Sequence, residues 1–371
     1  MRISKRLRAI KQFDFRGRCV KRMKPLLLMF KLLGMFANDI SGDRLKRCSR
    51  PFYGICVFWI SMYVSYTCFL SFSFVTSKSI STRVTIEFVK HVIGYISLSA
   101  NTIAIYSSQN LFGKYFDRLD SYDHEVARVA HERRDNFWIP WIATFSTTTV
   151  ILLLIIVMTQ ETSMGILFFV FLSDICTIIM HLFNTLEKFL ILYLILIRFK
   201  HLNEKIIPHV VWNEKHSPWN AKKRRIKTIK ISDVKIMYLM LYDAQQAFNG
   251  IYSNSLLLWF SSIMIHILEN VRIFREKSPL ISCAFVVPPI IQLLTLCAIC
   301  HYTAEEANKI PCTLNEGMSM LANSGQTTDK ISTLTYFLHN RVSFEAAGFF
   351  TINLPLFQSI IATITTYFII L

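Results

Sequence analysis

The sequence has little charge and none of the motifs that mark common enzyme classes. Only 18% of its 371 residues are charged and 53% are hydrophobic, and the mean hydropathy is +0.39. An average soluble domain has about 25% charged residues, and one soluble core cannot bury this much apolar surface. No G-x-S-x-G stretch, P-loop or dinucleotide-binding fingerprint occurs. We therefore expect a membrane protein that is not an enzyme and needs no cofactor.

Signals for export and for a folded extracellular domain are also missing. No Asn-x-Ser/Thr glycosylation site occurs. The first apolar stretch, Pro25–Phe36, is interrupted by Lys31 and lacks the small residues of a signal-peptide cleavage site. The nine cysteines fall within apolar runs or on the predicted cytoplasmic side, so we expect no disulfide bond. These absences predict short outer loops.

Apolar runs of about 20 residues are abundant instead, and each is long enough to cross a bilayer. The second run is the weakest, because Glu87, Lys90 and His91 interrupt its first half. The pattern predicts an all-α membrane protein with seven transmembrane helices, over Phe52–Val75, Val84–Ser108, Phe137–Thr159, Gly165–Ile197, Asn249–Leu268, Leu280–Tyr302 and Phe349–Leu371.

Basic residues set the predicted orientation, because cytoplasmic loops retain lysine and arginine. With the N-terminus inside, the four inner segments hold most of the 41 lysines and arginines. We predict a cytoplasmic N-terminus and, after seven crossings, an extracellular C-terminus. The basic N-terminal arm and the cluster Lys222–Arg225 then face anionic membrane lipid. This explains the net charge of +17 without a nucleic-acid partner.

The fourth apolar run is too long for a simple crossing. Gly165–Ile197 measures about 50 Å at helical rise, against about 30 Å for the hydrocarbon core. Its last part, Phe189–Ile197, would enter the cytoplasm, where an apolar helix needs a partner. We predict that this long fourth helix forms a cytoplasmic stalk with an extension of the fifth through Ile236–Phe248, and that subunits meet there. The alternative is a bend at Glu187–Lys188 that keeps the run at the membrane surface.

The last apolar run has two unlike faces. On a helical wheel its apolar residues gather opposite a polar arc. Such an arc either bonds to neighbouring helices or lines a water-filled path. Apolar residues after Thr366 would narrow that path to a constriction that gates by dewetting. The arc and the constriction comprise Gln358, Ser359, Thr363, Thr365, Thr366, Ile369 and Ile370.

Two parts of the chain resemble the insect gustatory receptor family. Leu338–Phe344 leads into Ala346–Asn353, which holds Gly-Phe-Phe, and the chain then reaches Thr-Tyr in Thr366–Leu371. This is similar to the family's C-terminal signature of Gly-Phe-Phe, then Thr-Tyr, five apolar residues and Gln-Phe. Ile197–Asn203 is similar to its Arg-Phe-x-x-Leu-Asn stretch after the fourth helix. Only four apolar residues follow Thr-Tyr here, so we expect the end of the signature to be missing, through truncation or in the natural protein.

The resemblance implies a tetrameric, ligand-gated, non-selective cation channel in the plasma membrane of sensory neurons, built from one or more kinds of gustatory receptor subunit. The polar arc and constriction of the last helix would line the central pore. Residues 1–51 would form a basic cytoplasmic arm, and residues 52–302 the first six helices with the ligand-binding bundle. Residues 303–348 would be a cytoplasmic anchor segment, and residues 349–371 the seventh, pore-lining helix.

The resemblance further implies that each subunit holds a small-molecule tastant in the outer half of its bundle. Ionisable residues within membrane helices are functional candidates by default, although each can instead pair structurally with a neighbour. Sugar receptors of the family often carry an acidic residue after Thr-Tyr. Phe368 stands there, which favours a bitter or other plant-derived tastant. The ligand-binding candidates are Glu87, His91, Tyr95, Asp174, Trp259, His266 and Gln292.

Other seven-helix classes fit less well. A G-protein-coupled receptor has its N-terminus outside, no Asp-Arg-Tyr follows the third run, and Asn353–Pro355 lacks the Asn-Pro order. A secondary transporter would show repeated halves with broken helices, and no such repeat is visible. A subunit like the insect odorant receptors is the alternative within the same architecture.

Overall fold

The computed structural model describes residues 18–41, 44–46, 50–76, 82–128, 167–208, 231–273, 279–319 and 335–370, with some positions between 139 and 149. These residues are mainly helical, with two short antiparallel hairpins, β1–β2 and β3–β4. The elements are α2 (Arg18–Leu32), β1 (Asp39–Ser41), β2 (Arg44–Lys46), α3 (Arg50–Thr76), α4 (Thr82–Ser107), α5 (Gln109–Arg128), α7 (Leu167–His201), the π-helical turn η1 (Leu202–Ile206), α9 (Ile231–Ile273), α10 (Pro279–Ser319), β3 (Glu345–Ala346), β4 (Phe350–Thr351) and α12 (Leu354–Ile370).

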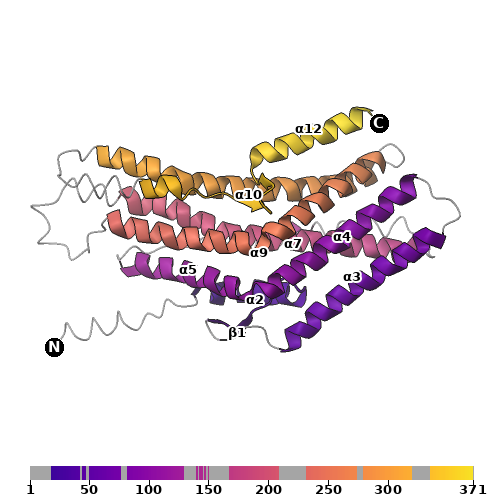
Figure 1. Ribbon diagram of the computed structural model, residues 1–371, viewed down its shortest axis with the longest axis horizontal. Helices are drawn as coiled ribbons and strands as arrows, with labels where there is room; N and C mark the ends of the chain where they lie inside the picture. The colour runs from indigo at the N-terminus through magenta and orange to yellow at the C-terminus, as the bar shows by residue number, and fades with distance from the viewer. Residues whose placement is uncertain are drawn as a thin grey trace, which may run out of the picture.

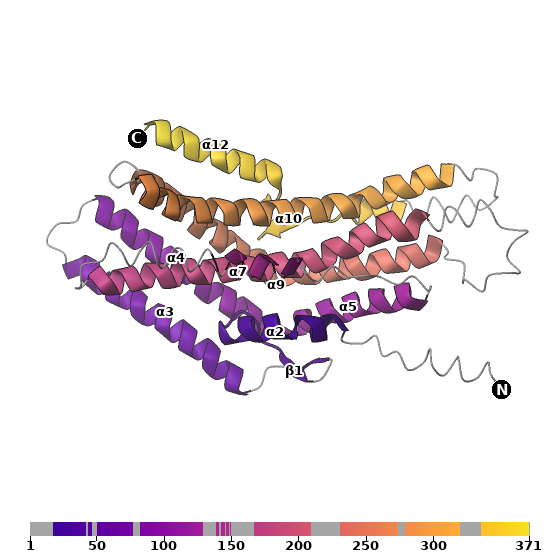
Figure 2. The same cartoon turned by 180° about the vertical axis from the view of Figure 1, so that it is seen from behind.

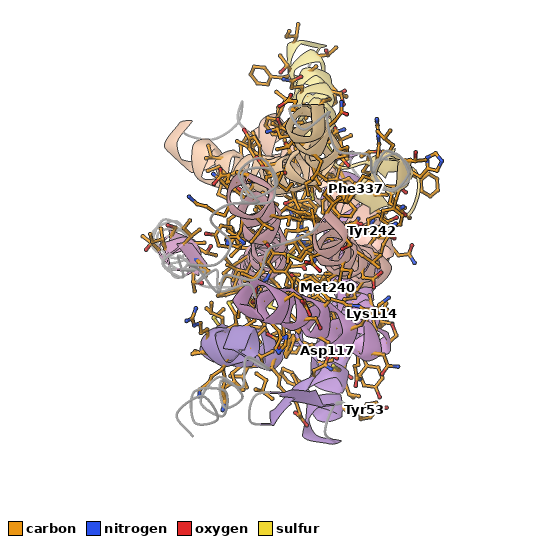
Figure 3. All side chains as sticks on the ribbon, turned by 90° about the vertical axis from the view of Figure 1, so that its left-hand side faces the viewer. Tyr53, Lys114, Asp117, Met240, Tyr242 and Phe337 are labelled. Carbon is orange, nitrogen blue, oxygen red and sulfur yellow. The ribbon has the colours of Figure 1, made fainter. Side chains whose placement is uncertain are left out.

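Three long helices form the spine of the molecule. Helices α7, α9 and α10 run along its long axis, and each packs against the other two (Figures 1 and 2). Helices α4 and α5 pack on α9, with α3 outside α4, while α12 lies on the outer side of α10 at a shallow angle to the long axis and also contacts α9. Figure 3 looks along the bundle: Phe337 lies above Tyr242 and Met240 of α9, and Lys114 and Asp117 of α5 lie below them.

Four of the described helices are long and apolar enough to cross a membrane. These spans are Phe88–Ser107, Thr177–Ile206, Ile231–Val271 and Val286–Glu316, and α3 and α12 contain shorter apolar stretches. They support the predicted helical membrane protein. Most of the predicted third span, Phe137–Thr159, lies outside the described residues. The count of seven helices and the orientation of the termini stay predictions.

The fifth and sixth helices extend well beyond their predicted spans. Helix α9 begins at Ile231 rather than Asn249, and α10 ends at Ser319 rather than Tyr302. The extension of α9 through Ile236 was anticipated from its apolar, helix-forming sequence. The extension of α10 was not, because Glu305, Glu306 and Lys309 make that part too polar for a membrane span. Hydropathy therefore predicts the apolar part of a helix and does not predict how far the helix continues beyond it.

The last helix begins later than predicted, at Leu354 rather than Phe349. Ala347 and Gly348 have φ angles of 51° and 74°, a conformation that cannot continue a helix. The residues around them form the hairpin β3–β4 instead. Asn353 then caps α12, since its Oδ1 accepts a hydrogen bond from the backbone N–H of Leu356 at 2.9 Å.

The apolar second half of α7 is buried within its own chain. The helix continues unbroken through Glu187 and Lys188, so the alternative of a bend there is wrong. Leu192 and Ile195 have no exposed surface, because α9, α10 and α5 surround this part of α7. The Tyr115 hydroxyl of α5 also donates to the Ile191 carbonyl at 2.5 Å. The long helices therefore pack together here, while the place of this part in the cytoplasm and the meeting of subunits there stay predictions.

Residues from the stretch after the fourth apolar run tie three helices together. The Arg198 guanidinium donates to both carboxylate oxygens of Asp123 on α5, at 3.1 and 2.6 Å. It also donates to the carbonyl of Leu194 at 2.7 Å. The Asn203 amide donates to the Glu306 carbonyl on α10 at 2.5 Å. These bonds give Arg198 and Asn203 a structural role at the junction of α5, α7 and α10.

Candidate functional site

A small cavity lies among α7, α9 and α10. It offers about 20 Å³ to the centres of water molecules, room for about one water. Its wall combines two histidines and two amides with apolar side chains, and none of these lining residues is an acid, a lysine or an arginine. The lining residues are Ile178, His181, Ile263, His266, Asn270, Pro288, Pro289 and Gln292.

The two histidines of the wall are close together. The ring centroids of His181 and His266 are 5.7 Å apart, with the rings inclined at 70°. Nε2 of His181 is 3.2 Å from the Ser262 hydroxyl. Nδ1 of His181 and Nε2 of His266 are buried and have no hydrogen-bond partner among the described residues. Burying such an atom unpaired is costly, so both nitrogens favour a bound molecule that hydrogen-bonds to them.

Helix α4 packs against the two histidines at Gly94. A Cβ atom built on Gly94 would lie 3.4 Å from Cγ2 of Thr177, 3.6 Å from Nε2 of His266 and 3.8 Å from Nε2 of His181. The missing side chain therefore leaves both imidazoles open toward α4. Any larger side chain at Gly94 would cover them.

The cavity contains two of the predicted ligand-binding residues and two that sequence reasoning missed. His266 and Gln292 line it, their part in ligand binding stays a prediction, and Oε1 of Gln292 accepts a hydrogen bond from Thr185 at 3.1 Å. His181 was missed although it is a polar residue in an apolar run, the signal that identified His266. Asn270 was missed because it follows the predicted end of the fifth span.

Three of the other predicted ligand-binding residues, His91, Tyr95 and Trp259, are described and are not among the residues that line this cavity. His91 and Tyr95 are buried on α4 on either side of Gly94, and the Tyr95 hydroxyl accepts a hydrogen bond from Thr177 at 3.2 Å. Trp259 has no exposed surface and packs edge-on against Phe260. Glu87 belongs to α4 and Asp174 to α7, but their side chains lie outside the described residues.

A buried charged layer follows the cavity along α7. Lys188 has no exposed surface, donates to Asn101 of α4 at 2.9 Å and also donates to Asn184. Its Nζ lies 4.8 Å from the centroid of the Tyr252 ring on α9. The Tyr252 hydroxyl donates to Glu187 at 2.6 Å. The layer links α4, α7 and α9 through hydrogen bonds from and to neutral side chains, and Oε2 of Glu187 has no hydrogen-bond partner among the described residues.

Helix α12 buries one face and exposes the other. Its apolar side packs inward through Phe357, Ile360 and Ile361, and Ile364 is only 6% exposed. The residues of the predicted polar arc are exposed in the single chain: Gln358, Ser359, Thr363, Thr365 and Thr366.

Hydroxyl groups of this arc bond to the helix that carries them. Ser359, Thr363 and Thr366 each donate to a carbonyl one turn earlier on α12, at 2.9 Å. In the part of the chain that the structure describes, these hydroxyls have no hydrogen bond to another helix. Ile369 of the predicted constriction is 75% exposed, and the side chain of Ile370 lies outside the described residues. The arc therefore faces away from its own bundle.

Comparison with known proteins points to one family. The sequence profile described as 7tm Chemosensory receptor matches residues 23–371. The insect olfactory receptor OR5 from Machilis hrabei in complex with eugenol has a similar fold, with a TM-score of 0.69 at 12% identity, over 94% of this chain and 97% of that chain. A second OR5 structure gives a TM-score of 0.71 at 12% identity, over 96% and 99%. No curated protein sequence matches. At 12% identity these likenesses show the fold alone.

Proposed function

Because the chain belongs to the 7tm chemosensory receptor family, we propose that it is a gustatory receptor acting as a tastant-gated, non-selective cation channel. Its fold is that of an insect olfactory receptor whose structure holds eugenol, which supports a small-molecule ligand. The Gly-Phe-Phe and Thr-Tyr stretches support taste over smell, and Phe368 after Thr-Tyr favours bitter or other plant-derived tastants over sugars. The channel lies in the plasma membrane of sensory neurons, with seven helices per subunit and its N-terminus in the cytoplasm.

The uncovered polar face of α12 carries this proposal. A membrane helix avoids presenting polar groups to lipid, yet Gln358, Ser359, Thr363 and Thr366 are exposed in the single chain. The three hydroxyls already donate within α12, so they need no neighbouring helix as an acceptor. Their remaining lone pairs suit water. We propose that four subunits, identical or mixed, bring these faces together around a pore, and that Ile369 and Ile370 form its apolar constriction.

The hairpin β3–β4 joins α12 to α9, the helix that also carries cavity-lining residues. Its backbone binds α9 at Ser253, whose hydroxyl accepts from the N–H of Ala347 at 2.8 Å and donates to the carbonyl of Glu345 at 3.0 Å. Farther along α9, Ile263 and His266 line the cavity. A ligand that binds the open state more tightly than the closed state shifts the receptor toward opening. We propose that a displacement of α9 transmits this preference to α12.

A resting-current measurement tests the pore. Ile370→Ser should let water into the constriction. Cells that express this variant should therefore carry a larger leak current when no ligand is present. Phe72→Ser on α3 is the control, since Phe72 is a large apolar residue that is 70% exposed in the single chain, close to the 75% of Ile369, but belongs to another helix than α12. Equal surface expression with unchanged leak in Ile370→Ser would contradict the pore assignment. A panel of bitter compounds, sugars and odorants on the same cells tests the taste assignment.

A further inference from the structure

We propose that the cavity among α7, α9 and α10 recognises a neutral molecule that carries a hydroxyl group on a compact apolar body. The inference rests on the proposed ligand-gated function and specifies the chemistry of the ligand. The recognition atoms are Nδ1 of His181 and Nε2 of His266, both buried without a hydrogen-bond partner among the described residues. The wall around them supplies apolar contacts from Ile178, Ile263 and the two prolines.

The imidazoles select a group that both donates and accepts hydrogen bonds. Nε2 of His181 bonds to the Ser262 hydroxyl at 3.2 Å, and a hydroxyl can serve as donor or acceptor, so either tautomer of His181 fits. When Nε2 of His181 carries the proton and donates to Ser262, Nδ1 is an acceptor, and when Nε2 accepts from Ser262, Nδ1 carries the proton and is a donor. A ligand hydroxyl satisfies either tautomer, whereas a carbonyl can only accept and an ammonium can only donate. A hydroxyl therefore matches the pair better than either.

The absence of charge on the described wall selects a neutral ligand. An ion that enters an uncharged cavity loses its hydration without gaining a counter-charge. His181 and His266 are 2% and 7% exposed, so water does not replace the lost shell. Lys90 on α4 is buried within electrostatic reach of His266. A carboxylate is therefore the rival ligand, and the experiment gives it a separate arm.

The proline pair of α10 lets the cavity accept a body larger than a water molecule. A proline inside a helix lacks the N–H for one backbone hydrogen bond, and α10 contains two prolines in succession, Pro288 and Pro289. Both prolines line the cavity. The part of α10 that has to shift to admit a larger ligand is therefore held by fewer backbone hydrogen bonds. The small volume also limits the ligand to a compact body.

Binding to the purified full-length chain in detergent tests the inference without any current. The probes are benzyl alcohol, toluene, which has the same ring without the hydroxyl, and benzoate, which is the charged rival. One buried hydrogen bond is worth about a factor of ten in affinity. Benzyl alcohol should therefore stabilise the chain at about tenfold lower concentration than toluene, and benzoate should not stabilise it. All measurements use one detergent concentration, so that partition into micelles is the same throughout.

Two variants locate the effect. His266→Leu removes one recognition nitrogen and should weaken benzyl alcohol about tenfold while leaving toluene unchanged. Gly94→Ala places a methyl group 3.6 Å from Nε2 of His266 and should weaken benzyl alcohol without endangering the fold, since alanine favours a helix. Gly113→Ala on α5 is the matched control, because nothing lies within 4 Å of its new Cβ.

The outcomes separate this inference from the channel proposal. Benzyl alcohol binding that depends on His266 supports the inference even if no current is ever recorded. Equal affinity for benzyl alcohol and toluene, tighter binding of benzoate, or unchanged binding in both variants overturns it. Where a hydroxyl-bearing ligand also evokes a current, the concentration that gives half of the maximal current can be compared among wild type, His266→Leu and Gly94→Ala. If this concentration is the same in all three, the inference is overturned and the channel proposal stands.

Discussion

Replacing Asp123 by alanine should destabilise the chain far more than replacing Arg118 by alanine. Asp123 is the carboxylate partner of Arg198, which is only 1% exposed, and the two side chains share two hydrogen bonds. Arg118 pairs with Asp243 at 2.9 Å, but these side chains are 41% and 24% exposed. The two pairs join α5 to different helices with similar distances and differ in burial, so they form a matched comparison.

The expected magnitudes follow from burial. Removing one partner of a buried ion pair leaves an uncompensated charge and costs about 3–5 kcal/mol. The Asp123 side chain is 21% exposed, and Arg198 keeps its bond to the Leu194 carbonyl, so water and that carbonyl lessen the penalty. We therefore expect about 3 kcal/mol for Asp123→Ala. A surface pair contributes at most about 1 kcal/mol, which is the limit for Arg118→Ala.

Thermal unfolding of the purified chain in detergent measures the difference. At roughly 2–3 °C per kcal/mol for a large domain, Asp123→Ala should lower the melting temperature by roughly 6–9 °C, and Arg118→Ala by less than roughly 3 °C. Adding Arg198→Met to Asp123→Ala removes the orphaned charge and should restore most of the loss. Equal shifts for the two single variants, or no recovery in the double variant, would refute the reasoning.

Three further predictions follow from burial, backbone geometry and charge. Leu192→Asp places a charge where no surface is exposed and should cost at least about 3 kcal/mol, seen as loss of the intact chain on a sizing column. Gly348→Ala adds a side chain at a φ of 74° and should lower stability by about 1 kcal/mol, whereas Gly113→Ala in a helix should raise it by about 0.5–1 kcal/mol, both measured by thermal unfolding. Antibody tags on intact cells should be hidden at Met1 and accessible at Leu371, and an accessible Met1 tag would overturn the topology.

The family and the long helices could be predicted from sequence because their signals are local. The resemblance carried by Ile197–Asn203 and the C-terminal stretches is confirmed by the family match over residues 23–371. The apolar end of α7 required a partner, and the structure supplies one. The late start of α12 was missed because its cause is the positive φ of Ala347, a residue that seldom adopts this conformation.

The candidate cavity could be predicted only in part. His266 and Gln292 were identified because polar residues in apolar runs are conspicuous. Their convergence with His181 and Asn270 depends on how α7, α9 and α10 are aligned along their lengths, which periodicity does not determine. Trp259 is buried in the packed core, which its size and aromaticity also suit, and its part in ligand binding stays a prediction.

Cysteine accessibility on α12 tests the central claim, that its polar face lines a cation pore, most directly. Thr366→Cys and Ile364→Cys are compared in cells by applying small water-soluble thiol reagents during ligand-evoked current. Thr366 is exposed in the single chain and Ile364 is 6% exposed. If the polar face lines the pore, modification should change the current of Thr366→Cys and leave that of Ile364→Cys unchanged. A ligand-evoked current that persists unaltered in Thr366→Cys would mean that the pore lies elsewhere.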